Sequence, residues 1–234
     1  MTDYPALFRA IETSLFEASS TPDLLRTELA KFKYTEKRSS DEELFDVFRD
    51  VTFASGFNAE TMNKYRDGLR KHFPNIATAM QCSDADLERI RASGEVIGNR
   101  RKLKACVENA KVIQRIASSY GSMQTYIDTY APFDKLENIV LLKEALDTQF
   151  SYLGPVTTFH FMTDIGLPVL KPDRVIMRLF RRLHLVDSES QIWRAVFEGR
   201  KIAEAVGEPI RYVDIVLVTF GQARTRDWGI QQGI

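Results

Sequence analysis

Apolar residues recur at intervals of three and four along nearly the whole chain. In the segment from Ala6 to Ala18, for example, Leu7, Ile11 and Leu15 fall on one side of a helix. This spacing is typical of an amphipathic helix, whereas a half-buried strand alternates apolar and polar residues. Strand-like alternation is hard to find anywhere in the chain. The sequence therefore predicts an all-α protein of about a dozen helices.

Polar caps and prolines mark where the expected helices begin. Thr21 is placed as an N-cap, with Pro22 at the first helical position. Ser83 and Asp86 have the spacing of a capping box in which Asp takes the place of Glu. Together the signals predict helices over residues 6–18, 22–32, 41–53, 58–72, 83–92, 99–118, 135–149, 157–164, 173–182, 188–206 and 209–220.

Length and composition allow one large or two small globular domains. The chain has 234 residues, of which 44% are hydrophobic, and this is ample for a buried core. No repeat or low-complexity linker divides it, so we expect a single bilobal domain with a cleft over residues 1–234 and a flexible tail from about residue 222. Lys+Arg and Asp+Glu are equal at 32 each, so any affinity for nucleic acid must come from charge gathered on one face.

The sequence gives no sign of a cofactor, a metal site or a membrane segment. Cys82 and Cys106 are too few for a disulfide framework, and neither has a Cys or His partner at the spacing of metal ligands. The N-terminal residues lack the basic and apolar regions of a signal peptide. No apolar run approaches the roughly 18 residues of a membrane span. We therefore expect a cytoplasmic monomer without a cofactor, a metal ion or a membrane partner.

The stretch from Tyr152 to Arg182 organises the functional prediction. It reads as a helix end, a tight Leu153-Gly154-Pro155-Val156 hairpin and a helix from Thr157 to Asp164. After a stop at Gly166, an extended loop leads to Asp173 at the start of a basic helix. We expect a helix-hairpin-helix that binds a DNA phosphate backbone. The hairpin and the Asp173 carboxylate are expected to lie on one DNA-facing edge.

Three blocks carry a resemblance to a known family. Residues 98–110, GNRRKLKACVENA, resemble the run Asn-Arg-x-Lys-Ile-x-Ala-x-x-x-Asn-Ala of the DNA 3-methyladenine glycosylase I family. Residues 153–167, LGPVTTFHFMTDIGL, are similar to that family's Val-Gly-Pro-Thr-Thr-x-x-x-Phe-Met-Gln-x-x-Gly-Leu, and residues 43–57 are similar to a third segment. The resemblance covers roughly residues 41–182. It implies a helix-hairpin-helix DNA glycosylase fold and the release of alkylated purines from duplex DNA.

The chain departs from this family at its metal and pocket residues. Two of the family's zinc ligands, a His and a Cys, fall at Arg174 and Arg178, and its N-terminal ligands are absent, so no metal is expected. The family's pocket glutamate falls at Val51, next to Asp50, and its pocket tryptophan falls at Ala59. The alkyladenine pocket of the family therefore does not simply carry over.

The loop before Asp173 resembles a wider superfamily. Residues 166–173, GLPVLKPD, are similar to the Gly-x-Pro-x-x-x-Val-Asp loop of helix-hairpin-helix glycosylases typified by endonuclease III, whose final Asp is the catalytic carboxylate. The resemblance assigns that role to Asp173. Bifunctional members add a lysine nucleophile just beyond the hairpin glycine, where this chain has Val156 and Thr157. A monofunctional glycosylase is therefore expected. An iron-sulfur cluster needs four cysteines after this domain, and the sequence has none there, so no cluster is expected.

Further residues are expected to hold the DNA and the base. A glycine at the tip of the hairpin lets backbone N–H groups approach a phosphate closely. A base that is flipped out of the stack needs a surface to stack on, and ring faces attract a base made cationic by alkylation. The predicted DNA contacts are Leu153, Gly154, Val156, Thr157, Arg100, Lys102 and Arg174, and the predicted base pocket is Phe53, Phe57, Tyr152 and Asp50.

Simpler interpretations stand beside these. Considered without the motif around it, an Asp at a helix start such as Asp173 is most simply an N-cap, and this role is compatible with catalysis. Phe53 and Phe57 have the spacing of core residues. Asp214 is an acid in an apolar helix, and we expect it to bond a group of the hairpin or the pocket. The prediction is a monofunctional glycosylase acting on a damaged, alkylated purine in double-stranded DNA. Two alternatives stay open: a DNA-binding homologue that has lost catalysis, and a helical protein-interaction module whose basic faces meet an acidic partner.

Overall fold

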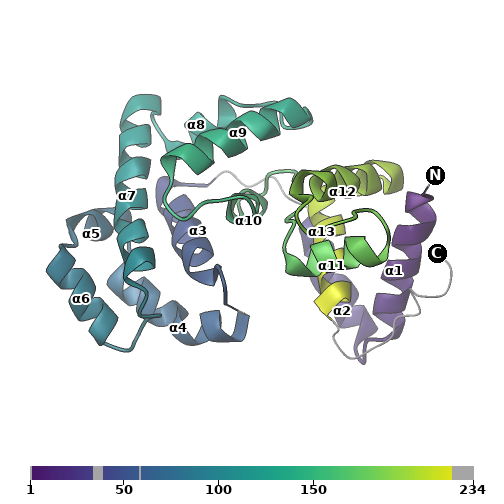
Figure 1. Cartoon of the computed structure of the whole chain (residues 1–234), viewed down its shortest axis with the longest axis horizontal. Coiled ribbons are helices and arrows are strands. Elements are labelled where there is room, and N and C mark those ends of the chain that lie inside the picture. The colour runs from purple at the N-terminus through teal and green to yellow at the C-terminus, as the bar shows by residue number, and fades with distance from the viewer. Residues whose placement is uncertain (1, 34–38, 58, 223–234) are drawn as a thin grey trace. The chain divides into compact units, whose positions relative to one another are not determined.

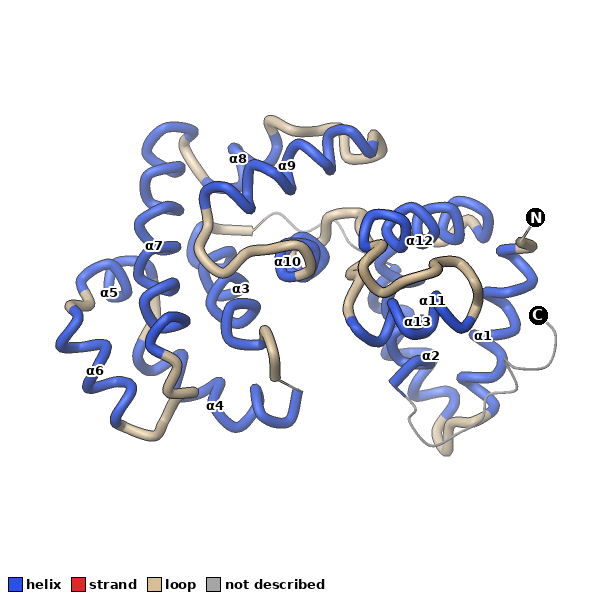
Figure 2. Tube along the Cα trace, viewed as in Figure 1, coloured by secondary structure: helices blue, strands red, loops and turns tan. Residues whose placement is uncertain are grey.

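A computed structural model describes residues 2–33, 39–57 and 59–222 of the chain. Within these ranges every regular element is a helix and no strand is present (Figure 2). The prediction of an all-α protein is therefore confirmed. The flexible tail that was predicted from about residue 222 falls on residues 223–234, which lie outside the described residues. None of the described helices combines the length and the apolar composition that crossing a bilayer requires.

The helices fall into two compact units (Figure 1). Unit 1 joins Met1–Glu36 to Gly166–Ile234, and unit 2 is Lys37–Ile165. Unit 1 contains α1 (Tyr4–Glu17), α2 (Pro22–Ala30), the 3-10 helix η1 (Lys31–Lys33), α11 (Arg174–Arg182), α12 (Ile192–Val206) and α13 (Ile210–Gln222). Unit 2 contains α3 (Asp41–Ala54), α4 (Ala59–His72), α5 (Ile76–Gln81), α6 (Asp84–Ala92), α7 (Arg100–Tyr120), α8 (Met123–Asp128), α9 (Leu136–Gln149) and α10 (Thr157–Asp164). The prediction of one domain over residues 1–234 stays a prediction.

Three stacked aromatic rings form the centre of unit 2. Phe48 of α3 stacks against Phe150, the C-cap of α9, with ring centroids 4.1 Å apart, and against Phe161 of α10, with centroids 3.8 Å apart. All three rings are buried. Stacked rings of this kind stabilise the fold by more than the apolar area they bury would predict. The two helices that flank the predicted hairpin are thus held against the same residue of α3.

Side-chain caps define the helix starts in unit 2. The Ser83 hydroxyl and the Asp86 carboxylate form the predicted capping box at the start of α6. The Asn99 side chain accepts hydrogen bonds from the backbone N–H groups of Arg101 and Lys102, at 3.1 and 3.2 Å, and so begins α7. These caps satisfy amide groups that a helix leaves without partners in its first turn.

Unit 1 packs α1, α11, α12 and α13 around an apolar core, which includes Ile11, Phe180, Ile202 and Phe220. The loop that precedes α11 is anchored in this core through Leu170, which is fully buried. A Cβ on Gly199 of α12 would lie 2.5 Å from the Leu170 side chain. Only glycine therefore permits this close approach of the loop to α12.

Two short helices were not predicted. α5 and α8 are six residues each, and Asn75 and Ser122 cap their first turns with side-chain oxygens. Fewer than two turns of helix place too few residues on one face to show a period of 3.6. The predicted start of the helix over residues 188–206 was also early, because α12 begins at Ile192.

Candidate functional site

The hairpin at residues 152–156 joins α9 to α10, and α7 fixes its entrance. Asn109 of α7 is 1% exposed and binds both backbone groups of Ser151. Its Nδ2 donates to the Ser151 carbonyl at 3.0 Å, and the Ser151 N–H donates to its Oδ1 at 2.8 Å. The Ser151 hydroxyl donates to Glu108 at 2.6 Å. The chain therefore enters the hairpin along a fixed path.

The exit of the hairpin is held by a polar cluster at the start of α10. The Thr158 hydroxyl donates to the Asp147 carboxylate and lies 3.0 Å from the Gly154 carbonyl. Lys143 lies 2.6 Å from the other oxygen of Asp147. Within the described residues, the N–H groups of Gly154, Val156 and Thr157 donate no hydrogen bond. The hairpin thus presents free backbone donors on a rigid base, which is the arrangement an anion requires.

Tyr152 has a φ of +65°, a conformation that few residues with a bulky side chain adopt. Its neighbours hold it there, because Ser151 is clamped on one side and Thr158 is bonded back to Gly154 on the other. Backbone strain of this kind often marks a functional position. Gly154, in contrast, has no neighbour within 4 Å of a Cβ built on it. The tip of the hairpin is therefore open.

We expect Asn109→Ala to loosen the hairpin. The substitution removes both partners of Ser151 and should lower the free energy of unfolding by about 2–3 kcal/mol, because buried polar groups lose their hydrogen bonds. Urea unfolding measures the stability, and hydrogen exchange of the Ser151 amide reports the local opening. Asn138→Ala is the control, because Asn138 donates one solvent-exposed bond to Pro132. A Ser151 amide that exchanges as slowly as in the wild type would contradict the role of Asn109.

The cations at the start of α7 have different surroundings. Arg100, a predicted DNA contact, is exposed and lies 3.0 Å from Glu88 and 3.6 Å from Asp84. Its charge is therefore largely balanced within unit 2. Arg101 is exposed and forms no ion pair with a described residue. Sequence reasoning did not select Arg101, although it lies inside the Asn-Arg-x-Lys block.

Lys102 is a buried residue, and this corrects its predicted role as a DNA contact. It is 3% exposed, and its ammonium group donates to the backbone carbonyls of Phe53, at 3.0 Å, and Ser55. It lies 4.8 Å from the centroid of the Phe57 ring and 5.9 Å from that of Tyr152. Burial lowers the pKa of Lys102 to about 8. The ammonium group therefore satisfies the C-terminal end of α3 and does not face a phosphate.

Lys102→Met tests this structural role. We expect the free energy of unfolding to fall by about 2–4 kcal/mol, because two carbonyl groups lose a charged donor. Lys104→Met is the matched control on the same helix, since Lys104 is exposed and, among the described residues, pairs with Glu108 alone at 3.7 Å. Both are measured by urea unfolding. If the methionine at position 102 left stability unchanged and weakened DNA binding, Lys102 would be a surface contact after all.

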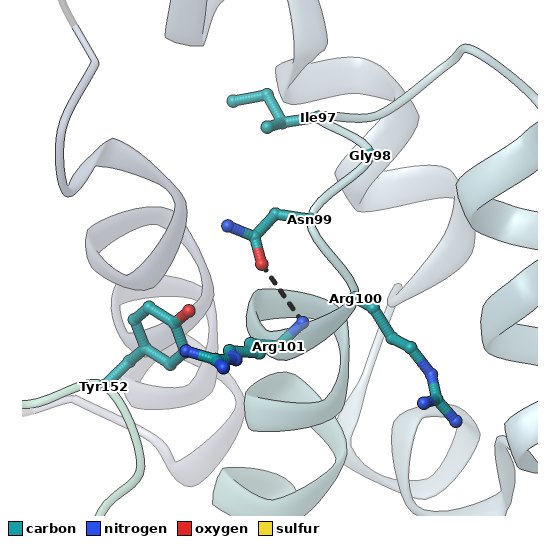
Figure 3. A pocket seen from close by; sticks show the side chains of 6 residues that line it. All are labelled: Ile97, Gly98, Asn99, Arg100, Arg101 and Tyr152. Carbon is teal, nitrogen blue, oxygen red and sulfur yellow. Dashed lines mark hydrogen bonds between the residues drawn. The ribbon is translucent and has the colours of Figure 1, made fainter.

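A shallow, open hollow of about 600 Å³ lies between the hairpin and the start of α7 (Figure 3). In Figure 3 the Arg101 side chain extends toward the Tyr152 ring, while Arg100 points away from it. The hollow thus combines an aromatic ring with a guanidinium group. Its lining residues are Ile97, Gly98, Asn99, Arg100, Arg101 and Tyr152.

The predicted base-pocket residues do not all gather in one place. Phe53 is fully buried and is a core residue, as its helical spacing allowed. Phe57 is 43% exposed, and it shares Lys102 as a neighbour with Tyr152. Asp50 pairs instead with Arg49 at 3.3 Å and with Arg66 of α4 at 3.7 Å. Phe57 and Tyr152 are therefore the predicted aromatic residues that have accessible surface in unit 2.

Asp173 is the N-cap of α11 and is partly exposed. A single carboxylate oxygen, Oδ1, accepts the N–H groups of Val175 at 2.8 Å and Ile176 at 3.1 Å. The second oxygen, Oδ2, lies 3.7 Å from the Lys171 ammonium group and accepts no hydrogen bond from the described residues. The capping role is thus confirmed. It uses one carboxylate oxygen, Oδ1, and leaves Oδ2 without a hydrogen bond from the described residues.

Asp214 of α13 holds the loop that ends at Asp173. Its carboxylate is buried, accepts the Lys171 N–H at 2.9 Å and pairs with Arg211 at 2.7 Å. Burial raises the pKa of Asp214 to about 6, and the nearby Asp173 carboxylate adds to the rise. Asp214 was expected to bond a group of the hairpin or the pocket, but its hydrogen bonds among the described residues are to Lys171 and Arg211, so it supports the Asp173 loop.

The zinc site associated with the resembled family does not fit this chain. Arg174 and Arg178 replace two ligands, and a guanidinium group has no lone pair to give a metal. Among the described residues, no group of three His, Cys, Asp or Glu side chains is arranged to hold a metal ion.

Solved structures with the same fold are helix-hairpin-helix DNA glycosylases. A structure of 8-oxoguanine glycosylase/lyase of Methanocaldococcus jannaschii with DNA containing 8-oxoguanine is 18% identical, with a TM-score of 0.62 over 91% of this chain and 95% of that one. The 8-oxoguanine DNA glycosylase of Thermotoga maritima is 19% identical, with a TM-score of 0.61 over 92% and 95%. A variant of 3-methyladenine DNA glycosylase I of Staphylococcus aureus is 21% identical, with a TM-score of 0.52 over 66% and 91%. At these identities the likeness establishes the fold, which was predicted.

The sequence itself identifies the family. No curated protein matches the chain. The profile of methyladenine glycosylases, however, matches residues 33–171, which is more than half of the chain. The match includes the Asn99–Lys102 block, the hairpin and α10, all of which the resemblance used. The chain belongs to the methyladenine glycosylase family.

Proposed function

We propose that the chain is a monofunctional DNA glycosylase that hydrolyses the N-glycosidic bond of a damaged, alkylated purine. The observation that carries this proposal is the carboxylate of Asp173, which is partly exposed, fixed by its own helix and left with one oxygen unused. Such a group is what glycoside hydrolysis needs. The family match supplies the substrate class.

Asp173 acts on the sugar of the flipped nucleotide. Cleavage of the N-glycosidic bond builds positive charge on the deoxyribose, and a carboxylate stabilises that oxocarbenium ion. The same carboxylate orients or deprotonates the attacking water. Lys171 lies near Oδ2, and two backbone N–H groups donate to Oδ1, so each oxygen of the carboxylate has a defined neighbour. An alkylated base is already a good leaving group, so one carboxylate suffices.

The absence of a lysine nucleophile supports hydrolysis without strand cleavage. Val156 and Thr157, at the start of α10, stand where bifunctional glycosylases place that lysine. Lys102 is buried and bonded to two carbonyl groups, so it does not replace the missing nucleophile. The product is therefore an abasic site in an intact strand.

The hairpin positions the DNA without reading its sequence. Free N–H groups at Gly154, Val156 and Thr157 bind phosphate oxygens, and contacts of this kind fix register on any duplex. Arg101 and Arg174 add exposed cations in unit 2 and unit 1. That the hairpin and Asp173 share one DNA-facing edge stays a prediction.

Release of free base tests the proposed function. Duplex DNA treated with a methylating agent is incubated with the protein, and the released bases are separated by chromatography. We expect methylated purines in the soluble fraction and unbroken strands until the abasic sites are cleaved by alkali. A second duplex that contains 8-oxoguanine tests the substrate named for the M. jannaschii and T. maritima structures. Release of neither kind of base would exclude the enzymatic proposal.

A DNA-binding homologue without catalysis is the second candidate. It is favoured by Val51, which is buried where the resembled family has its pocket glutamate, and by Asp50, whose carboxylate is engaged by Arg49 and Arg66. The base-release assay separates the candidates, because this homologue binds duplex DNA and releases no base.

A further inference from the structure

The polar face of α11 consists only of arginines. Its exposed residues are Arg174, Arg178, Arg181 and Arg182. The opposite face buries Ile176, Met177, Leu179 and Phe180 in the core of unit 1. The helix therefore has a fixed orientation, and its guanidinium groups form one continuous surface. We call these four residues the α11 arginine face.

The α11 arginine face is not balanced by acids. None of its four guanidinium groups forms an ion pair or a hydrogen bond with a described residue. Two exposed arginines of α6, in contrast, have carboxylate partners. Arg89 lies close to Asp86, and Arg91 lies 2.7 Å from Glu88. In a chain of zero net charge, this concentration of unpaired cations needs a separate explanation.

Helix stability explains only half of the α11 arginine face. Arg181 and Arg182 lie in the last turn, where cations interact favourably with the helix dipole. Arg174 is the first residue of the helix, where a cation is unfavourable, and Arg178 lies mid-helix, where the dipole has little effect. These two positions therefore favour an external anionic partner.

We propose that the α11 arginine face binds the phosphate backbone of duplex DNA, as a second contact surface in the unit that carries Asp173. Arg178, Arg181 and Arg182 line a hollow of about 320 Å³, whose single acid is Glu189. Guanidinium groups bind phosphate oxygens in pairs. From Arg174 to Arg182 the helix rises about 12 Å, which matches about three phosphates along one strand. This inference rests on the proposed function.

The salt dependence of binding measures these contacts directly. The full-length chain is titrated with undamaged duplex DNA at several salt concentrations, and the slope of log K against log salt is compared between variants. Each phosphate contact contributes about 0.9 to that slope. We expect Arg178→Ala/Arg181→Ala to reduce it by about 2. The control is Arg89→Ala/Arg91→Ala, which removes the same charge from the paired arginines of α6.

The outcomes separate this inference from the proposed function. A reduced slope for the α11 variant alone supports the phosphate contacts. An unchanged slope, or an equal reduction in both variants, overturns them even if the wild type binds DNA and releases base. A wild type that shows no salt-dependent binding of duplex overturns the proposed function as well. Circular dichroism confirms that each variant is folded, and the substitutions are at exposed positions.

Discussion

Asp173→Asn is expected to lower base release from alkylated duplex by about 10²–10⁴-fold. The amide cannot stabilise the positive charge that develops on the deoxyribose, and it cannot accept a proton from water. The fold should persist, because asparagine is as good an N-cap as aspartate. In the variant, the side-chain oxygen of asparagine can still accept the N–H groups of Val175 and Ile176. In the wild type these groups donate to Oδ1 of Asp173. Single-turnover base release measures the chemical step.

A second N-cap in the same unit provides the control for Asp173→Asn. Asp3 begins α1 and accepts the Ala6 N–H at 3.0 Å. Asp3→Asn makes the same chemical change at a helix start and should leave base release at the wild-type rate. Duplex affinity should be similar in both variants. Base release by Asp173→Asn at the wild-type rate would leave Asp173 as a cap only and would favour another carboxylate.

The sequence was sufficient where local patterns decide structure. Apolar spacing predicted most helices, Ser83 and Asp86 predicted a capping box, and the hairpin residues predicted the link between α9 and α10. Asp173 was predicted as a cap because its position before a helix is local information. The fold was predicted from the blocks that resemble the family, which lie in the hairpin and at the start of α7.

Tertiary packing decided what the sequence did not reveal. Lys102 lies in a run of cations and was taken for a surface residue, but a helix places it on one stripe with Cys106, Asn109 and Ile113, which are all buried. The position of Lys102 on this stripe was the signal in the sequence that could have predicted its burial. The pairing of Arg100 with Glu88 depends on how α6 packs against α7. The hydrogen bond that the Lys171 N–H donates to Asp214 joins residues 43 positions apart. No local pattern predicts either contact.

Gly154→Asp is expected to weaken duplex binding by roughly tenfold or more, because a carboxylate about 4 Å from a phosphate costs about 1–4 kcal/mol. The fold should tolerate the change, since a Cβ at this position meets nothing within 4 Å. Gly154→Asn is the matched control, because it adds the same volume without charge. Binding is measured by fluorescence anisotropy at low salt, where repulsion is least screened.

The comparison of Asp with Asn at position 154 also decides between classes of function. A hairpin that binds phosphate loses far more affinity with the acid than with the amide, and added salt narrows the difference. A helical module that recognises an acidic protein through other basic faces shows the same weak, hairpin-independent DNA binding in both variants. Gly154→Ala separates sterics from charge, because its methyl group only limits how closely the phosphate approaches the free N–H groups of Val156 and Thr157. Equal affinities for all three variants and the wild type would remove the hairpin from the DNA-binding surface.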